Sequence, residues 1–269
     1  MKLQRLAPIF GVLLLAFASV GCNKLRARDQ LNKGVGSFRN GQYQEAINHF
    51  QKAIEFDPSL LNARLYLATA SFQLYVPSGD SPDNVKVGED TIKDFEDVLK
   101  YDPNNVNAIS SIALIYYYMK NFEKAKQLQE ERIQIEPNNP EVYYWIGQLD
   151  WDLVYPRRMQ LRKDLGISNP KDPLKPDVFP PLPEKARAQL EEENGPLVDD
   201  GMKALQKAIE LRPDYNEAIA YLNLMYREKA DLEADPAAHD ADIAKANELN
   251  EQANNLLKAQ QAKAAQTTK

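Results

Sequence analysis

The sequence predicts an all-α fold, a solenoid built from about five helix pairs. The first observation is a sixteen-residue segment, helical in its pattern and closed by proline, that occurs four times, at 43–58, 88–103, 122–137 and 198–213. The second is spacing, because Pro103 and Pro137 are 34 residues apart. An internal period of this size is typical of stacked helix pairs, in which each repeat contacts its neighbours instead of sharing one central core.

Small and large residues alternate at fixed places when the four segments are aligned on their prolines. The fourth column holds Ala46, Thr91, Ala125 and Gly201, and the eighth holds Phe50, Phe95, Gln129 and Leu205. Residues four apart share one helical face. The small residue therefore admits a neighbouring helix and the large residue fills the groove beside it.

The closing prolines predict where each helix stops. Proline cannot donate the next helical hydrogen bond and disfavours helix in the residue before it. The residues that follow, Ser59, Asn104, Asn138 and Asp214, are turn and N-cap types for the next helix. A second set of helices is expected before these segments, at 30–40, 61–74, 106–120, 141–154 and 216–226.

This pattern resembles the tetratricopeptide repeat family. The family favours a small residue at position eight, where this chain has Gly34, Ala68, Ala113 and Gly147. It also favours alanine, a bulky apolar residue, alanine and proline later in the repeat, and the first repeat has all four as Ala46, Phe50, Ala53 and Pro58. The third repeat departs from this at Gln129 and Arg132, and the fifth has Asn223 at position eight and no closing proline.

The resemblance implies a right-handed α-solenoid at 27–263, with repeats at about 27–60, 61–105, 106–139, 140–215 and 216–263. Residues 240–261 would form the terminal capping helix. The fourth repeat contains a proline-rich insertion at 155–196, with a short acidic helix expected at 184–194. This insertion is interpreted as a lid, a docking strip or a decoration without function. Residues 264–269 are expected to be a disordered tail.

The N-terminus predicts export. Lys2 and Arg5 precede an uncharged, mostly apolar run at 6–18, and small residues lead to Cys22, the one cysteine of the chain. Residues 1–21 resemble a bacterial lipoprotein signal peptide, which implies an acylated Cys22 followed by a membrane-proximal linker at 22–26. By analogy with enteric bacteria, Asn23 favours the outer membrane, facing the periplasm. The alternatives are a plain signal peptide with a free Cys22 thiol, or an uncleaved anchor, although the apolar run is short for a membrane span of ~20 residues.

Composition and motifs argue against several function classes. Without Lys2 and Arg5 the chain has 31 basic and 39 acidic residues, a balance that disfavours nucleic acid. The two histidines, His49 and His239, lack the spacing of a zinc site. We therefore expect no cofactor, no metal site and no enzymatic activity.

In the family, the first helix of each pair lines a concave groove. Carried onto this chain, the groove positions hold Phe38, Phe72, Tyr117, Tyr118, Tyr144, Gln148 and Trp151. Aromatic rings are common anchors of protein recognition, so this groove is expected to bind a peptide or a folded subunit. The alternative is that several of these rings pack between repeats. One subtype of the family grips C-terminal carboxylates through lysine and asparagine. Here the corresponding first-repeat positions hold Arg28, Leu31 and Val35, so that clamp is not expected.

The resulting hypothesis is a lipid-anchored scaffold for protein–protein interactions in envelope assembly, such as outer-membrane protein insertion, pilus assembly or polysaccharide export. Two alternatives belong to other classes. One is a glycan-binding module in which Tyr144 and Trp151 stack sugars. The other is an enzyme, or an accessory to one, whose active site the insertion forms.

Overall fold

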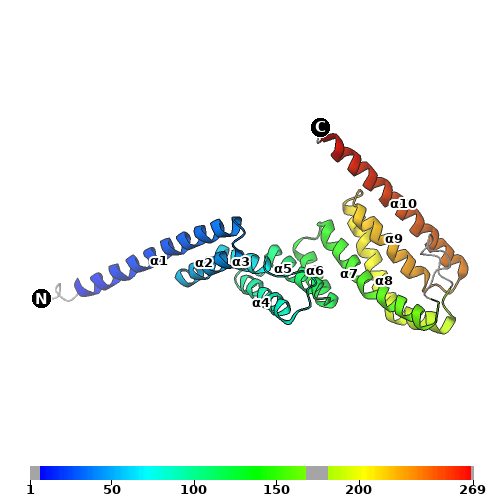
Figure 1. Cartoon of the computed structure of the whole chain (residues 1–269), viewed down its shortest axis with the longest axis horizontal. Helices are drawn as coiled ribbons and strands as arrows, with labels where there is room; N and C mark the ends of the chain where they lie inside the picture. Colours follow the sequence, from blue (N-terminus) through cyan, green and yellow to red (C-terminus); the bar gives the residue numbers. More distant parts are fainter. Residues whose placement is uncertain (1–6, 168–180, 268–269) are drawn as a thin grey trace. The chain divides into compact units, whose positions relative to one another are not determined.

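A computed structural model describes residues 7–167 and 181–267, with side chains at 22–167 and 181–265. These residues form ten α-helices and no β-strand, which confirms the predicted all-α class (Figure 1). The helices are α1 (Ala7–Arg39), α2 (Tyr43–Phe56), α3 (Leu61–Phe72), α4 (Pro82–Leu99), α5 (Val106–Tyr118), α6 (Phe122–Ile135), α7 (Pro140–Asp164), α8 (Glu184–Leu211), α9 (Asn216–Ala230) and α10 (Pro236–Thr267).

The helices fall into two units. The first is residues 1–120 and contains α1 to α5, and the second is residues 121–269 and contains α6 to α10. The boundary lies in the short turn after α5, where Lys120 has a φ of 59°. It divides the predicted third repeat between the two units.

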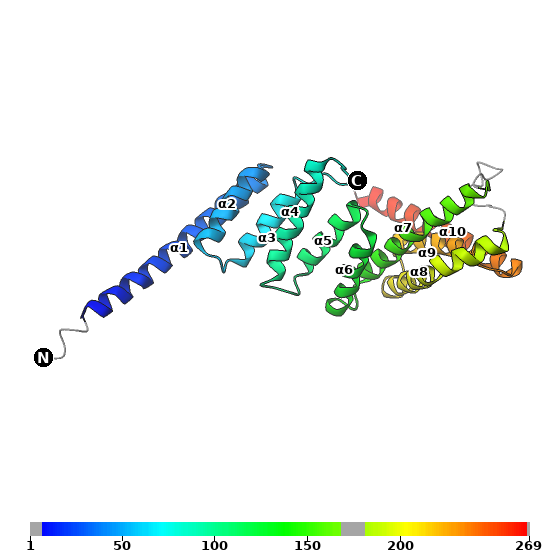
Figure 2. The same cartoon turned by 90° about the horizontal axis from the view of Figure 1, so that it is seen from below.

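Within each unit, helices pack mainly against those adjacent in sequence. In the first unit α1 packs on α2, α2 on α3, α3 on α4, and α4 on α5. In the second unit α6 packs on α7, α7 on α8, α8 on α9, and α9 on α10, with α7 also contacting α9 (Figure 2). This is the nearest-neighbour packing expected of a repeat array.

Close helix approach depends on the small residues identified in the sequence. A Cβ atom at Gly34 of α1 would meet the ring of Phe50 on α2, which is fully buried. A Cβ at Gly147 of α7 would likewise meet Leu205 on α8. In both units a small position-eight residue of the first helix therefore faces a bulky residue of the second helix.

The helix ends follow the prolines, with the caps one residue later than expected. Helices α2, α4, α6 and α8 all end shortly before Pro58, Pro103, Pro137 and Pro213. The next N-caps are Leu60, Asn105, Asn139 and Tyr215. Of these, the side chains of Asn105 and Asn139 accept hydrogen bonds from backbone N–H groups of the following turn, each at 3.0 Å. The residue directly after each proline instead belongs to the turn.

The third repeat keeps the helix but changes its buried chemistry. Gln129 and Arg132 occupy positions where the other repeats have apolar residues, and both are buried. Arg132 Nη1 donates to Gln129 Oε1 at 2.9 Å, and its Nη2 donates to Glu136 Oε2 at 2.8 Å. The two departures from the family pattern therefore compensate each other, because Gln129 and Arg132 are hydrogen-bond partners in the buried interior.

The insertion in the fourth repeat is largely helical where it is described. Helix α7 continues past the predicted end at 154 to Asp164, and α8 already begins at Glu184. Pro156 and Pro196 lie inside these helices on exposed positions, so the expected helix ends at 154 and 194 are wrong. Packing overrides the local cost of proline: α7 and α8 contact each other, and buried Asn194 Nδ2 donates to Val154 O at 3.0 Å. Residues 168–180 of the predicted insertion lie outside the described residues.

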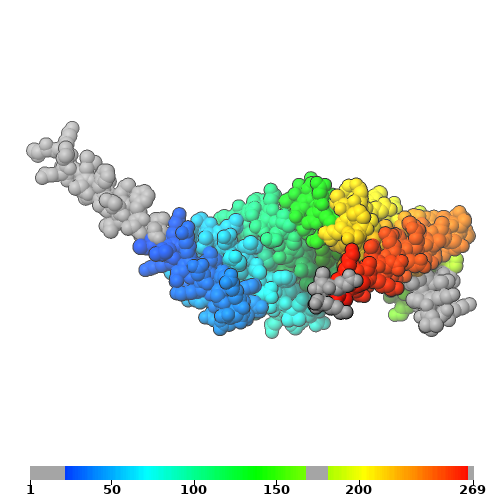
Figure 3. Space-filling view, turned by 90° about the horizontal axis from the view of Figure 1, so that it is seen from above, coloured from blue at the N-terminus to red at the C-terminus, as the bar shows by residue number. Residues whose placement is uncertain are grey.

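Both ends of the chain are more helical than expected. Helix α1 runs without a break through 22–26, the predicted linker, and Ala27 is already 0% exposed. Helix α10 packs along α9 (Figure 3) and continues through 264–267, part of the predicted disordered tail. Two alanines and one glutamine in these four residues favour helix. Across the described residues, no helix has a stretch apolar and long enough to cross a bilayer.

Candidate partner-binding surface

The seven predicted groove residues are divided between the two units. Phe38, Phe72, Tyr117 and Tyr118 lie in the first unit, and Tyr144, Gln148 and Trp151 lie in the second. All six rings are partly exposed, whereas Gln148 is buried. Each unit therefore carries its own part of the predicted groove.

In the first unit the predicted rings contact other rings. Phe38 meets Tyr43 edge to face, with ring centroids 5.4 Å apart. Buried Tyr75 lies between Phe72 and Tyr118, at 6.4 Å from each. Tyr118 also meets Tyr117 at 5.7 Å. These rings contribute to packing between neighbouring helices while keeping part of their surface exposed.

In the second unit four rings form what we call the α7–α9 aromatic cluster: Tyr144, Trp151 and Tyr155 on α7, and Tyr221 on α9. Trp151 stacks on Tyr155, with centroids 4.7 Å apart and an interplanar angle of 24°. Tyr221 meets both Trp151 and Tyr144 edge to face, each at 5.6 Å. Tyr155 is 36% exposed. The cluster is thus preorganised by contacts among its own rings.

Two members of this cluster, Tyr155 and Tyr221, were not among the residues predicted from the sequence. Tyr155 lies one helical turn after Trp151, but the predicted helix ended at 154. Tyr221 lies on α9 and is not among the seven predicted groove residues. The spacing of four residues between Trp151 and Tyr155 could have identified the first. Only the packing of α7 on α9 identifies the second.

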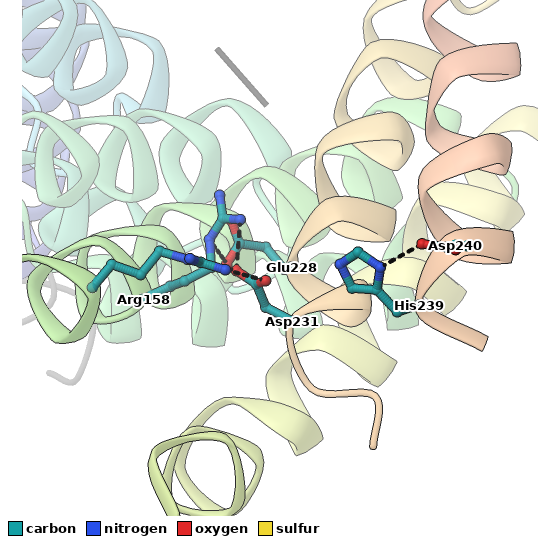
Figure 4. Close-up of polar contacts among 6 residues, drawn as sticks. Arg158, Glu228, Asp231, His239 and Asp240 are labelled. Carbon is teal, nitrogen blue, oxygen red and sulfur yellow. Dashed lines mark hydrogen bonds and ion pairs between the residues drawn. The ribbon is translucent and has the colours of Figure 1, made fainter. Parts of the chain in front are cut away.

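Beyond the rings, α7 and α9 are joined by a buried set of charges, the α7–α9 ion cluster: Arg158, Arg162, Glu228 and Asp231. Arg158 Nε lies 3.0 Å from Glu228 Oε2, and its Nη1 donates to Asp231 Oδ2 at 3.1 Å (Figure 4). Arg162 donates from Nε to Asp231 Oδ2 at 3.0 Å and from Nη2 to Oδ1. Two arginines thus face two carboxylates, which compensates the charges of the cluster.

Burial affects the carboxylates of this region strongly. It raises the pKa of Glu228 to about 7, even though Arg158 acts in the opposite direction.

His239 is not part of the α7–α9 ion cluster, since it pairs with the adjacent Asp240 at 3.0 Å on α10 (Figure 4). The guanidinium of Arg158 also lies over the Tyr155 ring, 5.6 Å from its centroid. Arg158 therefore connects the ion cluster to the aromatic cluster.

A second buried charge contact joins α6, α7 and α8. Lys126 Nζ lies 2.7 Å and 3.0 Å from the two carboxylate oxygens of buried Asp150, and it also donates to Asp200. Burial raises the pKa of Asp150 to about 7, opposed by its contact with Lys126. This contact is internal to the repeat and holds three helices together.

Asp152, two residues further along α7, has a different environment. Its Oδ2 is covered yet accepts no hydrogen bond. Burial alone raises its pKa to about 6, with no charged group contributing to the shift. Asp152 lies one turn from both Gln148 and Tyr155 on the helix surface, beside the aromatic cluster.

The remaining predicted features concern metals and the lipid site. Among the residues that the structure describes, no three His, Cys, Asp or Glu side chains are grouped so as to hold a metal ion. His49 Nδ1 lies 2.7 Å from Gln30 Oε1, a contact between α1 and α2. Cys22 is exposed near the point where side-chain packing begins.

Stacked helix pairs with small-to-large packing define a helical-repeat scaffold. Family models described as "TPR repeat" and "Tetratricopeptide repeat" match residues 38–74 and 106–139. The chain is a tetratricopeptide-repeat protein, and its general function is that of a scaffold for protein–protein interactions.

Relatives and solved structures agree with this fold. Hsp70-Hsp90 organizing protein 3 of Arabidopsis thaliana is 26% identical over 197 residues, which cover 68% of this chain and 33% of that protein. This chain thus matches about one third of the relative's length. The structure of MamA from Desulfovibrio magneticus RS-1 covers 84% of this chain and 96% of MamA at 16% identity, with a TM-score of 0.51. YrrB, described as a TPR protein with an unusual peptide-binding site, covers 91% of this chain and 97% of YrrB at 12% identity, with a TM-score of 0.53.

Proposed function

We propose that this chain is an exported, lipid-anchored scaffold that holds a protein partner during envelope assembly, with the α7–α9 aromatic cluster as its anchor point. The observation that carries the proposal is the geometry of the cluster. Four partly exposed rings are held together by contacts of 4.7–5.6 Å on two adjacent helices. Preorganised aromatic rings lose little conformational entropy on binding, which makes them effective anchors for a protein partner.

The similar proteins support a peptide or protein as the ligand. YrrB is described as having a peptide-binding site, and the Arabidopsis relative is named as an organizing protein for Hsp70 and Hsp90. The particular partner is expected to differ from a chaperone tail. The first-repeat positions that would grip a C-terminal carboxylate hold Arg28, Leu31 and Val35, and the carboxylate of Asp152 would repel an acidic tail.

The anchor test uses Trp151→Ala. This change is expected to weaken partner capture by about 2 kcal/mol or more, as central aromatic anchors do, while the protein stays folded. Tyr101→Ala is the matched control, because Tyr101 is 56% exposed and lies in the other unit. Partners recovered from membranes by each variant would be compared alongside thermal melts. Equal recovery of the partner by Trp151→Ala and Tyr101→Ala would exclude the cluster as the anchor. Loss of the cooperative thermal unfolding transition in Trp151→Ala would show that the ring belongs to the core.

The lipid anchor is supported by the signal-like N-terminus and by the exposure of Cys22. Two acyl chains on one cysteine suffice to hold a protein on a membrane without a spanning helix. Cys22→Ser should release the protein into the soluble fraction, and mass spectrometry of the wild type should show an acylated Cys22 at the N-terminus. Retention of Cys22→Ser on membranes after a salt wash would contradict the proposal. Fractionation of inner and outer membranes would then decide between the two envelope membranes.

A further inference from the structure

The side chains of α7 near the aromatic cluster separate into two groups. Asp150, Arg158 and Arg162 are buried and have oppositely charged partners within 3.1 Å. Asp152 lies on the same helix, its Oδ2 is covered, and that oxygen accepts no hydrogen bond. A covered carboxylate oxygen without a hydrogen-bond partner costs free energy, so Oδ2 of Asp152 disfavours the folded state unless a ligand compensates it.

The surroundings of Asp152 favour a specific kind of ligand. Residues three and four apart on a helix are neighbours, so Asp152 borders Tyr155 on one side. The rest of the Asp152 side chain is partly exposed, and rotation about its terminal torsion, which has a broad energy profile, can turn Oδ2 outward. A carboxylate beside aromatic walls suits a cation on an apolar stem.

We propose that Asp152 and the α7–α9 aromatic cluster together receive a lysine or arginine side chain of the protein partner. This inference rests on the proposed function and specifies the chemistry of the partner. The basic head group would pair with the Asp152 carboxylate through a charge-assisted hydrogen bond, and its methylene stem would pack on the rings.

Two further observations agree with a basic partner. Guanidinium groups of the chain itself already lie over rings of this region, Arg158 over Tyr155 at 5.6 Å and Arg212 over Tyr215 at 4.4 Å. The chain without Lys2 and Arg5 carries 39 acidic and 31 basic residues, so its field attracts a basic segment and accelerates encounter at low salt.

The direct test is a titration with two blocked pentapeptides that differ at one central residue. One has arginine flanked by alanines, and the other has citrulline, which keeps the shape but lacks the charge. The Trp151 indole N–H resonance reports on binding. The arginine peptide should bind the wild-type protein at least about tenfold more tightly than the citrulline peptide, equivalent to ~1.4 kcal/mol. In Asp152→Asn this preference should disappear.

Asp164→Asn is the matched control. It makes the same chemical change on the same helix, at an exposed carboxylate that accepts from Gln160 at 2.7 Å. It should retain the preference for arginine over citrulline. Equal binding of the two peptides to the wild type would overturn the inference, and so would an unchanged preference in Asp152→Asn.

The outcomes also separate this inference from the proposed function. If Trp151→Ala abolishes partner capture while Asp152→Asn leaves both capture and peptide preference unchanged, the anchor stands and the cation site is wrong. If the arginine preference depends on Asp152 but Trp151→Ala recovers the partner normally, the cation site stands and the proposed anchor is wrong.

Discussion

The first and fourth repeats use the same helix pairing but different chemistry around it. In the first repeat Phe50 packs over Gly34, inside a cluster of apolar side chains. In the fourth repeat Leu205 packs over Gly147 in the same way. There, however, α7 continues beyond the repeat, and its extension is joined to α9 by the four charges of the α7–α9 ion cluster.

The difference shows how a repeat can be enlarged without a new hydrophobic core. Apolar packing stabilises the shared part, where the family pattern applies. The extension of α7 is held in place by buried charges. Each of these charges stabilises the fold only when its oppositely charged partner is in contact with it. We therefore expect single substitutions in the two regions to differ in cost and in what they unfold.

The largest effect is expected from Asp231→Ala. The change leaves Arg158 and Arg162 buried beside one carboxylate only, and breaking a buried charge cluster costs about 3–5 kcal/mol. Urea denaturation would measure the loss, and hydrogen exchange should show the extension of α7 opening first. Asp240→Ala, at an exposed neighbouring carboxylate, is the control and should change stability by less than ~0.5 kcal/mol. Similar costs for the two variants would show that the ion cluster does not hold the extension.

The next effect is expected from Phe50→Ala in the first repeat. Removing a fully buried ring from an apolar cluster costs about 3 kcal/mol or more because a cavity remains. Leu74→Ala in the same unit is the control, since Leu74 is among the exposed large apolar residues. In a repeat array the loss should concentrate in neighbouring helices, so hydrogen exchange should increase in α1, α2 and α3 and stay unchanged in α9. Uniform exchange across the chain would contradict nearest-neighbour stability.

The sequence allowed the first repeat to be predicted well, and the fourth only in part. Ala46, Phe50 and Pro58 act locally, through helix periodicity and the missing N–H of proline, so their roles follow from spacing. Pro156 did not behave as a helix stop because contacts between α7 and α8 outweigh its local preference. Residues 264–267 continue α10 for the opposite reason: here the local preference itself favours helix, because alanine and glutamine have high helix propensity.

The candidate site was predictable to a smaller extent. Spacing identified Trp151 and Tyr144 as groove residues, because the family pattern extends to both. The partners of Arg158 and Arg162 are 69 to 73 residues away along the chain, and no periodicity connects them. The same holds for Asp152, whose distinctive property is the absence of a partner for Oδ2, which only three-dimensional packing reveals.

An intermediate effect is expected where the third repeat replaces apolar packing with a hydrogen bond. Gln129→Leu removes an acceptor from buried Arg132 and should cost about 1–2 kcal/mol. Adding Arg132→Ala restores the residue types that the family favours and should recover most of that loss. A double-mutant cycle by urea denaturation should give a coupling energy of at least ~0.5 kcal/mol. Additive effects would show that the two residues are independent.

The smallest effect, and the one of opposite sign, is expected from Asp152→Asn. Burial raises the folded-state pKa of Asp152 to about 6, above the unfolded value of ~3.9. The ionised carboxylate therefore disfavours the folded state above pH 6, and this penalty disappears as the pH falls through 6 towards 4. Removing the charge should thus stabilise the protein by on the order of 1 kcal/mol at pH 7.5 and by almost nothing at pH 4.

The quantity to measure is the difference in unfolding free energy between variant and wild type at each pH. Asp150 and Glu228 also have raised pKa values, so they change the stability of both proteins with pH in the same direction as Asp152 does. Asp164→Asn supplies the exposed control and should show no such pH-dependent gain. Partner binding should have the reverse dependence, since an Asp152 that pairs with a basic side chain must be ionised: capture should weaken below pH 6 in the wild type but not in Asp152→Asn. A variant that is less stable than the wild type at pH 7.5 would mean that Asp152 has a stabilising partner within the fold, and the argument for an external cation would then fail.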